Sequence, residues 1–185
     1  MGKAPNLRYT QPLPANSIAM FVQLFERQKA SAEHAIEQIT DEHLFARPTD
    51  GMNSIAIIIQ HISGNLRSRW TDFLTSDGEK PDRNRDTEFA EPPHDRELLM
   101  QKWDDAWAIT LASIGSLSPD DLSRIVTIRS VPHTVHAALC RSMEHIGYHV
   151  GQIHLLARLL HGSAGWNWLT IPPGGSQTFN DQLMK

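Results

Sequence analysis

The chain has 185 residues, 40% hydrophobic and 21% charged, a composition that excludes a disordered chain, a collagen and a disulfide-rich scaffold. The net charge of −4 argues against a nucleic-acid partner, which would need a basic surface, and gives no reason to expect an anionic membrane as partner. The single cysteine, Cys140, cannot form an internal disulfide, so we expect a reducing, cytoplasmic location. Residues 1–16 lack the apolar core of a signal peptide.

Apolar residues recur at three- or four-residue steps in four segments, which predicts four helices. Their expected bounds are residues 17–39, 53 or 54 to 74, 95–117, and 132 or 133 to 161. The isoleucine run at residues 55–59 could also be a buried strand, and it is too short to span a bilayer. The apolar pattern continues through Trp70 and Phe73, which favours a helix. Gly162 is a suitable stop for the last one.

The segments between the helices differ in character. Residues 40–52 contain Pro48 and Asp50-Gly51, which should end the first helix. Residues 76–94 hold nine charged residues and three prolines, which favours a solvated loop over one that lines the entrance to a site. Residues 122–130 read as a short strand or an extended link. We predict an all-α protein, a four-helix bundle at residues 17–161 with an irregular, Trp-containing tail at 162–185, forming one domain over residues 1–185.

Ten histidines are the unusual feature of the composition. At about 100° per residue, His145, His149 and Gln152 share one face of the last helix. The i, i+4 spacing brings the two imidazoles within reach of one ion. His61 is the only histidine on the second helix, where it interrupts an apolar face. It is either a hydrogen-bonded core residue or a third ligand. The other seven are expected to be structural or solvent-facing: His34, His43, His94, His133, His136, His154 and His161.

Three neutral imidazoles suit zinc, nickel or ferrous iron and leave coordination positions open for water or a substrate. Gln152 could orient that substrate, as could Tyr148 and Arg141 at the margins of the same helix face. No HExxH motif is present, because residue 146 is isoleucine. The di-iron spacing Glu-x-x-His occurs only at residues 91–94, where two prolines keep it out of a helix interior.

His61 and the segment HIGYHVGQI, which contains His145, His149 and Gln152, resemble the DinB/YfiT-like metal-binding superfamily of four-helix bundles. The segments NSIAIIIQHISGN, RWTDFLTSDGEKPDRNRDTEF and NWLTIPPGGSQTFN resemble a domain-of-unknown-function branch of it. The resemblance covers about residues 18–180. It implies a divalent metal on the three histidines, with water completing the shell. Characterised members include transferases that use bacillithiol, mycothiol or glutathione, and a mycothiol-dependent maleylpyruvate isomerase; dimers are common among them.

Three functions follow as hypotheses. The first is a metal-dependent enzyme, a thiol S-transferase or a hydrolase in type, acting on a small molecule with or without a low-molecular-weight thiol. The second is a non-catalytic metal- or ligand-binding module that forms a homodimer through its aromatic tail. The third is a scaffold in which the histidines are metal-free core residues.

Overall fold

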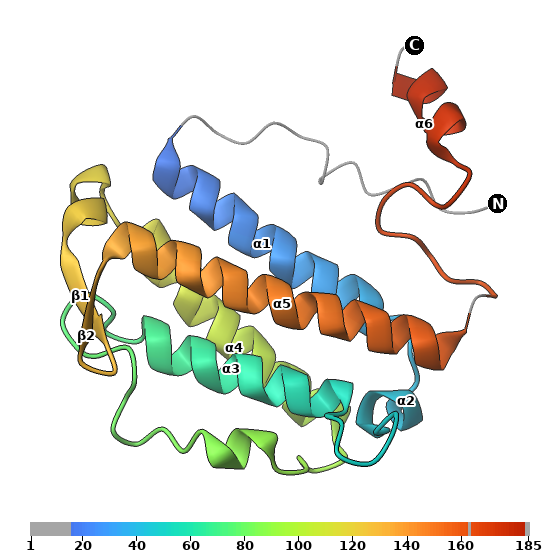
Figure 1. The fold of residues 1–185 in the computed structure, drawn as a ribbon, viewed down its shortest axis with the longest axis horizontal. Helices are drawn as coiled ribbons and strands as arrows, with labels where there is room; N and C mark the ends of the chain where they lie inside the picture. The colour runs from blue at the N-terminus through green and yellow to red at the C-terminus, as the bar shows by residue number, and fades with distance from the viewer. Residues whose placement is uncertain (1–15, 163, 184–185) are drawn as a thin grey trace.

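The computed structural model describes residues 16–162 and 164–183. The segment expected to lack a signal peptide, residues 1–16, lies outside this range except for Asn16. Four long helices lie side by side: α1 (Ser17–Ile36), α3 (Ile55–Trp70), α4 (Arg96–Gly115) and α5 (Val135–His161) (Figure 1). Helix α3 packs against α4 and α5, and α1 packs against α5 and α4. The fold is mostly helical, with one small sheet of two strands among the described residues.

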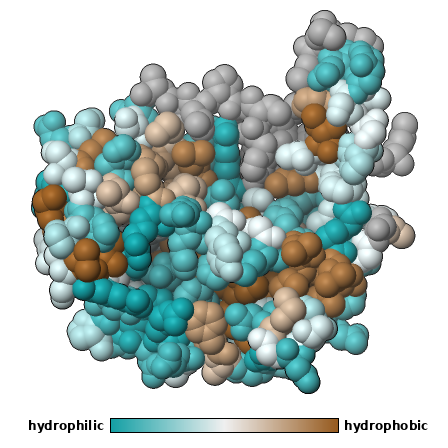
Figure 2. Space-filling model, viewed as in Figure 1, coloured by the Kyte–Doolittle hydropathy of each residue, from teal (hydrophilic) through white to brown (hydrophobic). Residues whose placement is uncertain are grey.

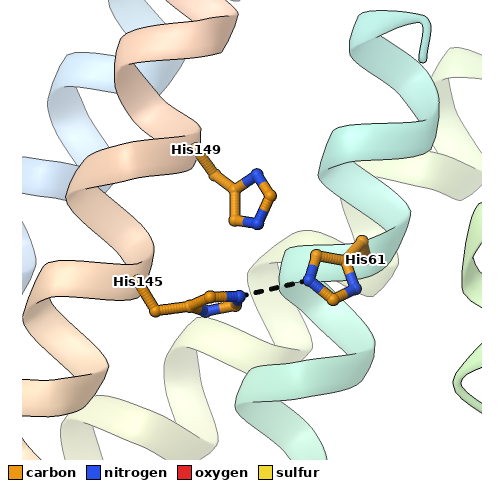
Figure 3. Close-up of side chains that lie close together, drawn as sticks. All are labelled: His61, His145 and His149. Carbon is orange, nitrogen blue, oxygen red and sulfur yellow. Dashed lines mark hydrogen bonds between the residues drawn. The ribbon is translucent and has the colours of Figure 1, made fainter. Parts of the chain in front are cut away.

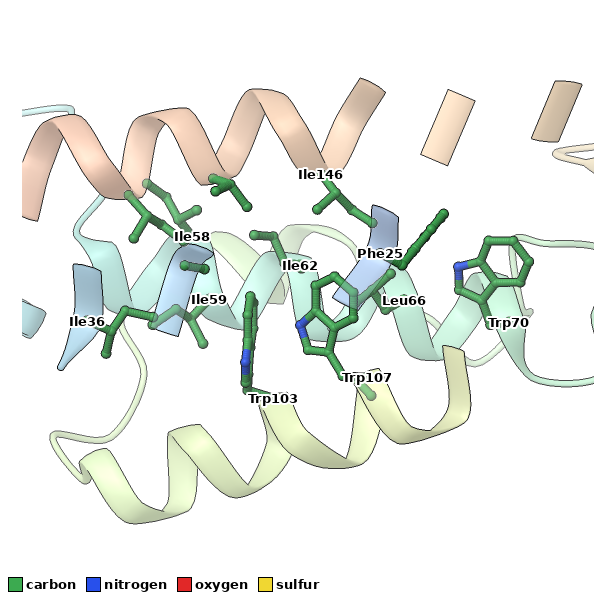
Figure 4. Packing of buried hydrophobic residues seen from close by; sticks show 14 of the residues in the cluster. Phe25, Ile36, Ile58, Ile59, Ile62, Leu66, Trp70, Trp103, Trp107 and Ile146 are labelled. Atoms are coloured by element: carbon green, nitrogen blue, oxygen red, sulfur yellow. The ribbon is translucent and has the colours of Figure 1, made fainter. Parts of the chain in front are cut away.

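The core between these helices is aliphatic and aromatic. Trp103 and Trp107 on α4 are fully buried and pack edge to face, and Phe25 of α1 meets both Trp107 and Trp70 in the same way (Figure 4). The isoleucines that open α3 are buried among them, so the isoleucine run is a helix and not a strand. No helix in the described part of the chain combines the length and apolarity that a membrane crossing requires.

Side-chain caps set the helix starts. Asn16 accepts hydrogen bonds from the first N–H groups of α1, Ser54 caps α3, Asp95 caps α4 and Thr134 caps α5. Each such cap contributes about 1 kcal/mol, because it satisfies an N–H that has no partner within the helix. At the other end of α5, Gly162 has a φ of 82°, so the predicted glycine stop is confirmed.

Several predicted bounds were wrong. Helix α1 ends at Ile36, and a short helix α2 (Asp41–Phe45), capped by Thr40, follows in the expected break. Helix α3 ends at Trp70 rather than residue 74, and α4 ends at Gly115 rather than residue 117. The tail is not irregular throughout, because it contains α6 (Ser176–Leu183). Two 3₁₀ helices, η2 (Asp86–Phe89) and η3 (Pro119–Ser123), lie in the connections.

The last long helix also begins later than predicted, because residues 131–134 form a strand. Strand β1 (Ile125–Ile128) pairs antiparallel with β2 (Val131–Thr134), and Pro132 is opposite Thr127. A proline is tolerated here because a two-stranded sheet consists only of edges. The segment expected to be a strand or a link is therefore one arm of a hairpin.

The hairpin turn is strained and is held by one carboxylate. Arg129 and Ser130 have φ values of 54° and 61°, a conformation that L-residues other than Asn and Asp rarely adopt. Asp77 accepts hydrogen bonds from the N–H groups of Arg129 and Ser130, both at 2.8 Å. Burial raises the pKa of Asp77, but hydrogen bonds from backbone N–H groups outweigh it and hold that pKa well below its usual range.

Replacing Ser130 by glycine should therefore stabilise the protein. We expect Ser130→Gly to raise the free energy of unfolding by about 0.5–1 kcal/mol, since glycine adopts positive φ without strain. Urea denaturation measures this. Ala112→Gly, inside α4, is the matched control and should lower the free energy of unfolding by about 1 kcal/mol. Equal losses in both variants would show that the turn is not strained.

Candidate metal centre

The three predicted histidines come together between two helices. His61 lies near the middle of α3, and His145 and His149 lie one turn apart on the facing side of α5 (Figure 3). One ring nitrogen from each lies within 4.8 Å of the others. The Nε2 atoms of His61 and His145 are 3.2 Å apart. A tetrahedral ion with metal–nitrogen bonds of about 2.0–2.1 Å needs its nitrogens about 3.4 Å apart, so these residues could hold a metal ion.

The protonation states suit a metal ligand. Burial, together with charge repulsion from the nearby His149 and His61, lowers the pKa of His145 to about 4. Burial also lowers the pKa of His149, against the opposing effect of its hydrogen bond to Gln152. Both rings are therefore neutral at physiological pH. A neutral imidazole has a free lone pair, which is the form that coordinates a metal.

A buried carboxylate orients His61. Nδ1 of His61 lies 2.8 Å from Oε2 of Glu88, and only 7% of the Glu88 surface is exposed. Because an ionised carboxylate only accepts hydrogen bonds, Nδ1 donates to Glu88, and Nε2 is the ring nitrogen that faces His145. Carboxylate–histidine pairs of this kind fix ring orientation at metal sites. Burial raises the pKa of Glu88, but hydrogen bonds from His61 and Arg83 outweigh it and lower the pKa overall.

Glu88 itself is held by an arginine from the same loop. Arg83 donates from Nε to Oε1 of Glu88 at 2.7 Å and from Nη2 to Oε2 at 2.8 Å, a two-pronged pair. Its remaining nitrogen, Nη1, donates to Glu79 at 2.8 Å. The expectation of a solvated loop over residues 76–94 was therefore wrong for these residues, which are turned inward against α3.

Two residues of α3 position this loop, one by hydrogen bonding to its backbone and one by leaving space for a side chain. The side-chain amide of Gln60 donates to the backbone carbonyls of Thr87, Glu88 and Ala90, at 3.0–3.2 Å. Gly64 lies one helical turn further on, and a Cβ there would be 2.5 Å from Oε1 of Glu88. Glu88 is not predictable from the sequence pattern, because its separation from His61 follows no helical or strand period. A glycine three residues after a buried histidine was the available signal.

The three residues proposed to orient a substrate have different surroundings. Gln152 accepts from Nδ1 of His149 at 2.8 Å and donates to the hydroxyl of Tyr148 at 3.0 Å. Tyr148 is largely exposed, with its ring edge-on to His149. Arg141 lines a pocket of about 420 Å³ whose wall also includes His61 and His145. The other seven histidines lie outside the cluster; His154, for example, bonds to Ser31.

The lowered pKa of His145 makes the stability of the metal-free protein depend on pH. His145 titrates near 6.5 when unfolded and near 4 when folded. Between these values the unfolded chain binds more protons, so the free energy of unfolding should decrease as the pH falls from about 7 to about 4. Urea denaturation across this range should show a shallower slope for His145→Gln. His43→Gln, outside the cluster, should keep the wild-type slope; equal slopes in the two variants would contradict the pKa assignment.

Known proteins share this fold without explaining the site. A search of curated proteins finds no match. The crystal structure of a conserved protein of locus from Enterococcus faecalis superposes with a TM-score of 0.62 over 81% of this chain and 100% of that one, at 15% sequence identity. That level of identity supports a common fold alone. The model of a family described as proteins of unknown function matches residues 14–175, so the chain belongs to the DUF1572 family.

Proposed function

We propose that this protein binds one divalent metal ion through His61, His145 and His149, in a four-helix bundle of the DinB-like kind. The observation that carries the proposal is the convergence of three buried or half-buried imidazoles whose lone pairs share one space. Without an ion, those lone pairs would face one another with too few protons to satisfy them. Zinc, nickel and ferrous iron all accept such a donor set.

We further propose that the site serves an enzyme, of the thiol S-transferase or hydrolase type, acting on a small molecule. Three protein ligands support this, because structural zinc sites usually close with four. An ion held in this way supplies Lewis acidity, which lowers the pKa of a coordinated water or low-molecular-weight thiol. The chain contributes the orientation of His61 through Glu88 and that of His149 through Gln152. The pocket beside His61 and His145 supplies space for a substrate.

A non-catalytic dimeric module is the second candidate, and one surface feature favours it. Tyr148, Leu155 and Leu159 are exposed at spacings of seven and four residues along α5, which puts them on one stripe. Figure 2 shows hydrophobic residues at the surface over the C-terminal half of this helix. An exposed apolar stripe of this length is typical of a helix that packs against a partner, here a second copy of the chain. A cytoplasmic location, which we propose because a single cysteine favours a reducing compartment, is compatible with either function.

Metal content is the first test. Elemental mass spectrometry of tag-free protein should find about one zinc, nickel or iron per chain, and His149→Ala should lose it because two imidazoles hold an ion far more weakly than three. His154→Ala is the matched control, since it removes a half-buried histidine of the same helix that bonds to Ser31 instead. Protein without metal after reconstitution with each ion would refute the proposal. Turnover of a thiol with an electrophile by the metal-loaded protein would support the enzyme over the non-catalytic module.

The role of Glu88 gives a second test. Glu88→Gln keeps the shape of the side chain but removes the charge that orients His61, so zinc affinity should fall by about 10- to 100-fold. Competition with a chromogenic chelator measures the change. Asp86→Asn removes an exposed carboxylate of the same 3₁₀ helix and should leave affinity unchanged. An unaltered affinity in Glu88→Gln would show that the carboxylate only anchors its loop.

A further inference from the structure

The pocket beside the histidine cluster is lined by an unusual concentration of positive charge. Its wall combines side chains of α3, α5, the β1–β2 hairpin and the loop over residues 76–94. Five arginines and one carboxylate, that of Glu144, contribute to it, in a chain whose net charge is −4; the arginines are Arg69, Arg83, Arg85, Arg129 and Arg141. A concave site with an excess of positive charge, against the overall balance of the protein, attracts a negatively charged ligand.

Among the described residues, carboxylates form ion pairs with only two of these arginines. Arg83 pairs with Glu88 and Glu79, and Arg129 donates to Glu79 at 3.3 Å. Arg85 lies 4.8 Å from the centre of the Phe89 ring, which is a cation–π contact. Neither Arg69 nor Arg141 donates a hydrogen bond to any residue in the described part of the chain. Their charge is therefore available to a ligand.

Burial of Arg69, which is only 9% exposed, is costly because, unlike Arg83, it has no carboxylate partner among the described residues. Its Nη1 atom is buried without a hydrogen-bond partner among the described residues. Burial, with repulsion from Arg141 and Arg83, lowers its pKa to about 10, and the guanidinium stays protonated at neutral pH. Gly78 covers it closely, since a Cβ at that position would lie 3.0 Å from Cδ of Arg69.

A second polar group on the same wall also lacks a partner. Ser142 is 6% exposed, and its hydroxyl makes no hydrogen bond within the described residues. Unsatisfied buried groups each cost about 1–3 kcal/mol, and charged ones more. Two of them in one pocket wall are explained together if a ligand satisfies both.

We propose that this pocket binds an oxyanion group, a carboxylate or a phosphate, of a small-molecule substrate, with Arg69 and Ser142 as its anchors and Arg141 beside them. Arginine and hydroxyl donors suit both kinds of oxyanion. The volume of about 420 Å³ is that of a site for a whole small molecule rather than for an isolated ion. This assignment rests on the proposed function, because it takes the oxyanion to belong to a substrate of the metal site. His61 and His145 line the same pocket.

The test uses the full chain, metal-loaded and metal-free, with inorganic phosphate and succinate as probes. Isothermal titration calorimetry should show binding of at least one probe to the wild type, and which one binds distinguishes phosphate from carboxylate. Arg69→Met and Ser142→Ala should each weaken that binding by at least about tenfold. Arg67→Met removes an exposed arginine of the same helix that does not line the pocket, and it should bind as the wild type does.

Thermal unfolding of the ligand-free variants separates a binding role from a structural one. Arg69→Met should raise the melting temperature, because it removes a buried cation that has no partner. A lowered melting temperature with probe binding retained would overturn the proposal, as would a wild type that binds neither probe. Metal content measured on the same samples keeps the two proposals apart. Metal uptake without probe binding refutes only the oxyanion site, and probe binding without metal uptake refutes only the metal centre.

Discussion

The hydrogen-bonded chain from His61 through Glu88 to Arg83 is the interaction on which the site depends. A carboxylate as buried as Glu88 needs partners for both oxygens, and Arg83 and His61 supply them. The same contacts hold the loop over residues 76–94 against α3 and place Arg83 and Arg85 in the pocket wall. One buried ion pair therefore orients a histidine and positions a cationic surface at once.

Two glycines allow this arrangement. Any side chain at Gly64 would collide with the Glu88 carboxylate, and any at Gly78 would press on Arg69. Glycine inside a helix costs about 1 kcal/mol relative to alanine, so Gly64 lowers the stability of α3 in exchange for the close approach of the loop.

Several features of the pocket oppose stability. Arg69 is buried beside other arginines, Ser142 has an unsatisfied hydroxyl, and the turn that carries Arg129 has two residues at positive φ. Unfavourable features of this kind cluster where a protein binds a ligand, because the surrounding fold supplies the stability that they remove. Here the aromatic core of α1, α3 and α4 supplies it, and Asp77 holds the turn.

The sequence by itself determined the features that repeat with the helical period. His145, His149 and Gln152 share a face because their spacing is local to one helix, and His61 was recognisable as a polar break in an apolar face. The strand at residues 131–134 was missed because a strand forms only by hydrogen bonding to a partner, here residues 125–128 of the hairpin. Glu88, Arg69 and Ser142 were also missed, since loop conformation and helix packing decide what they face. Contacts between distant segments follow no sequence period, so only the tertiary structure showed that charged residues of a loop and of two helices line one pocket beside the histidines.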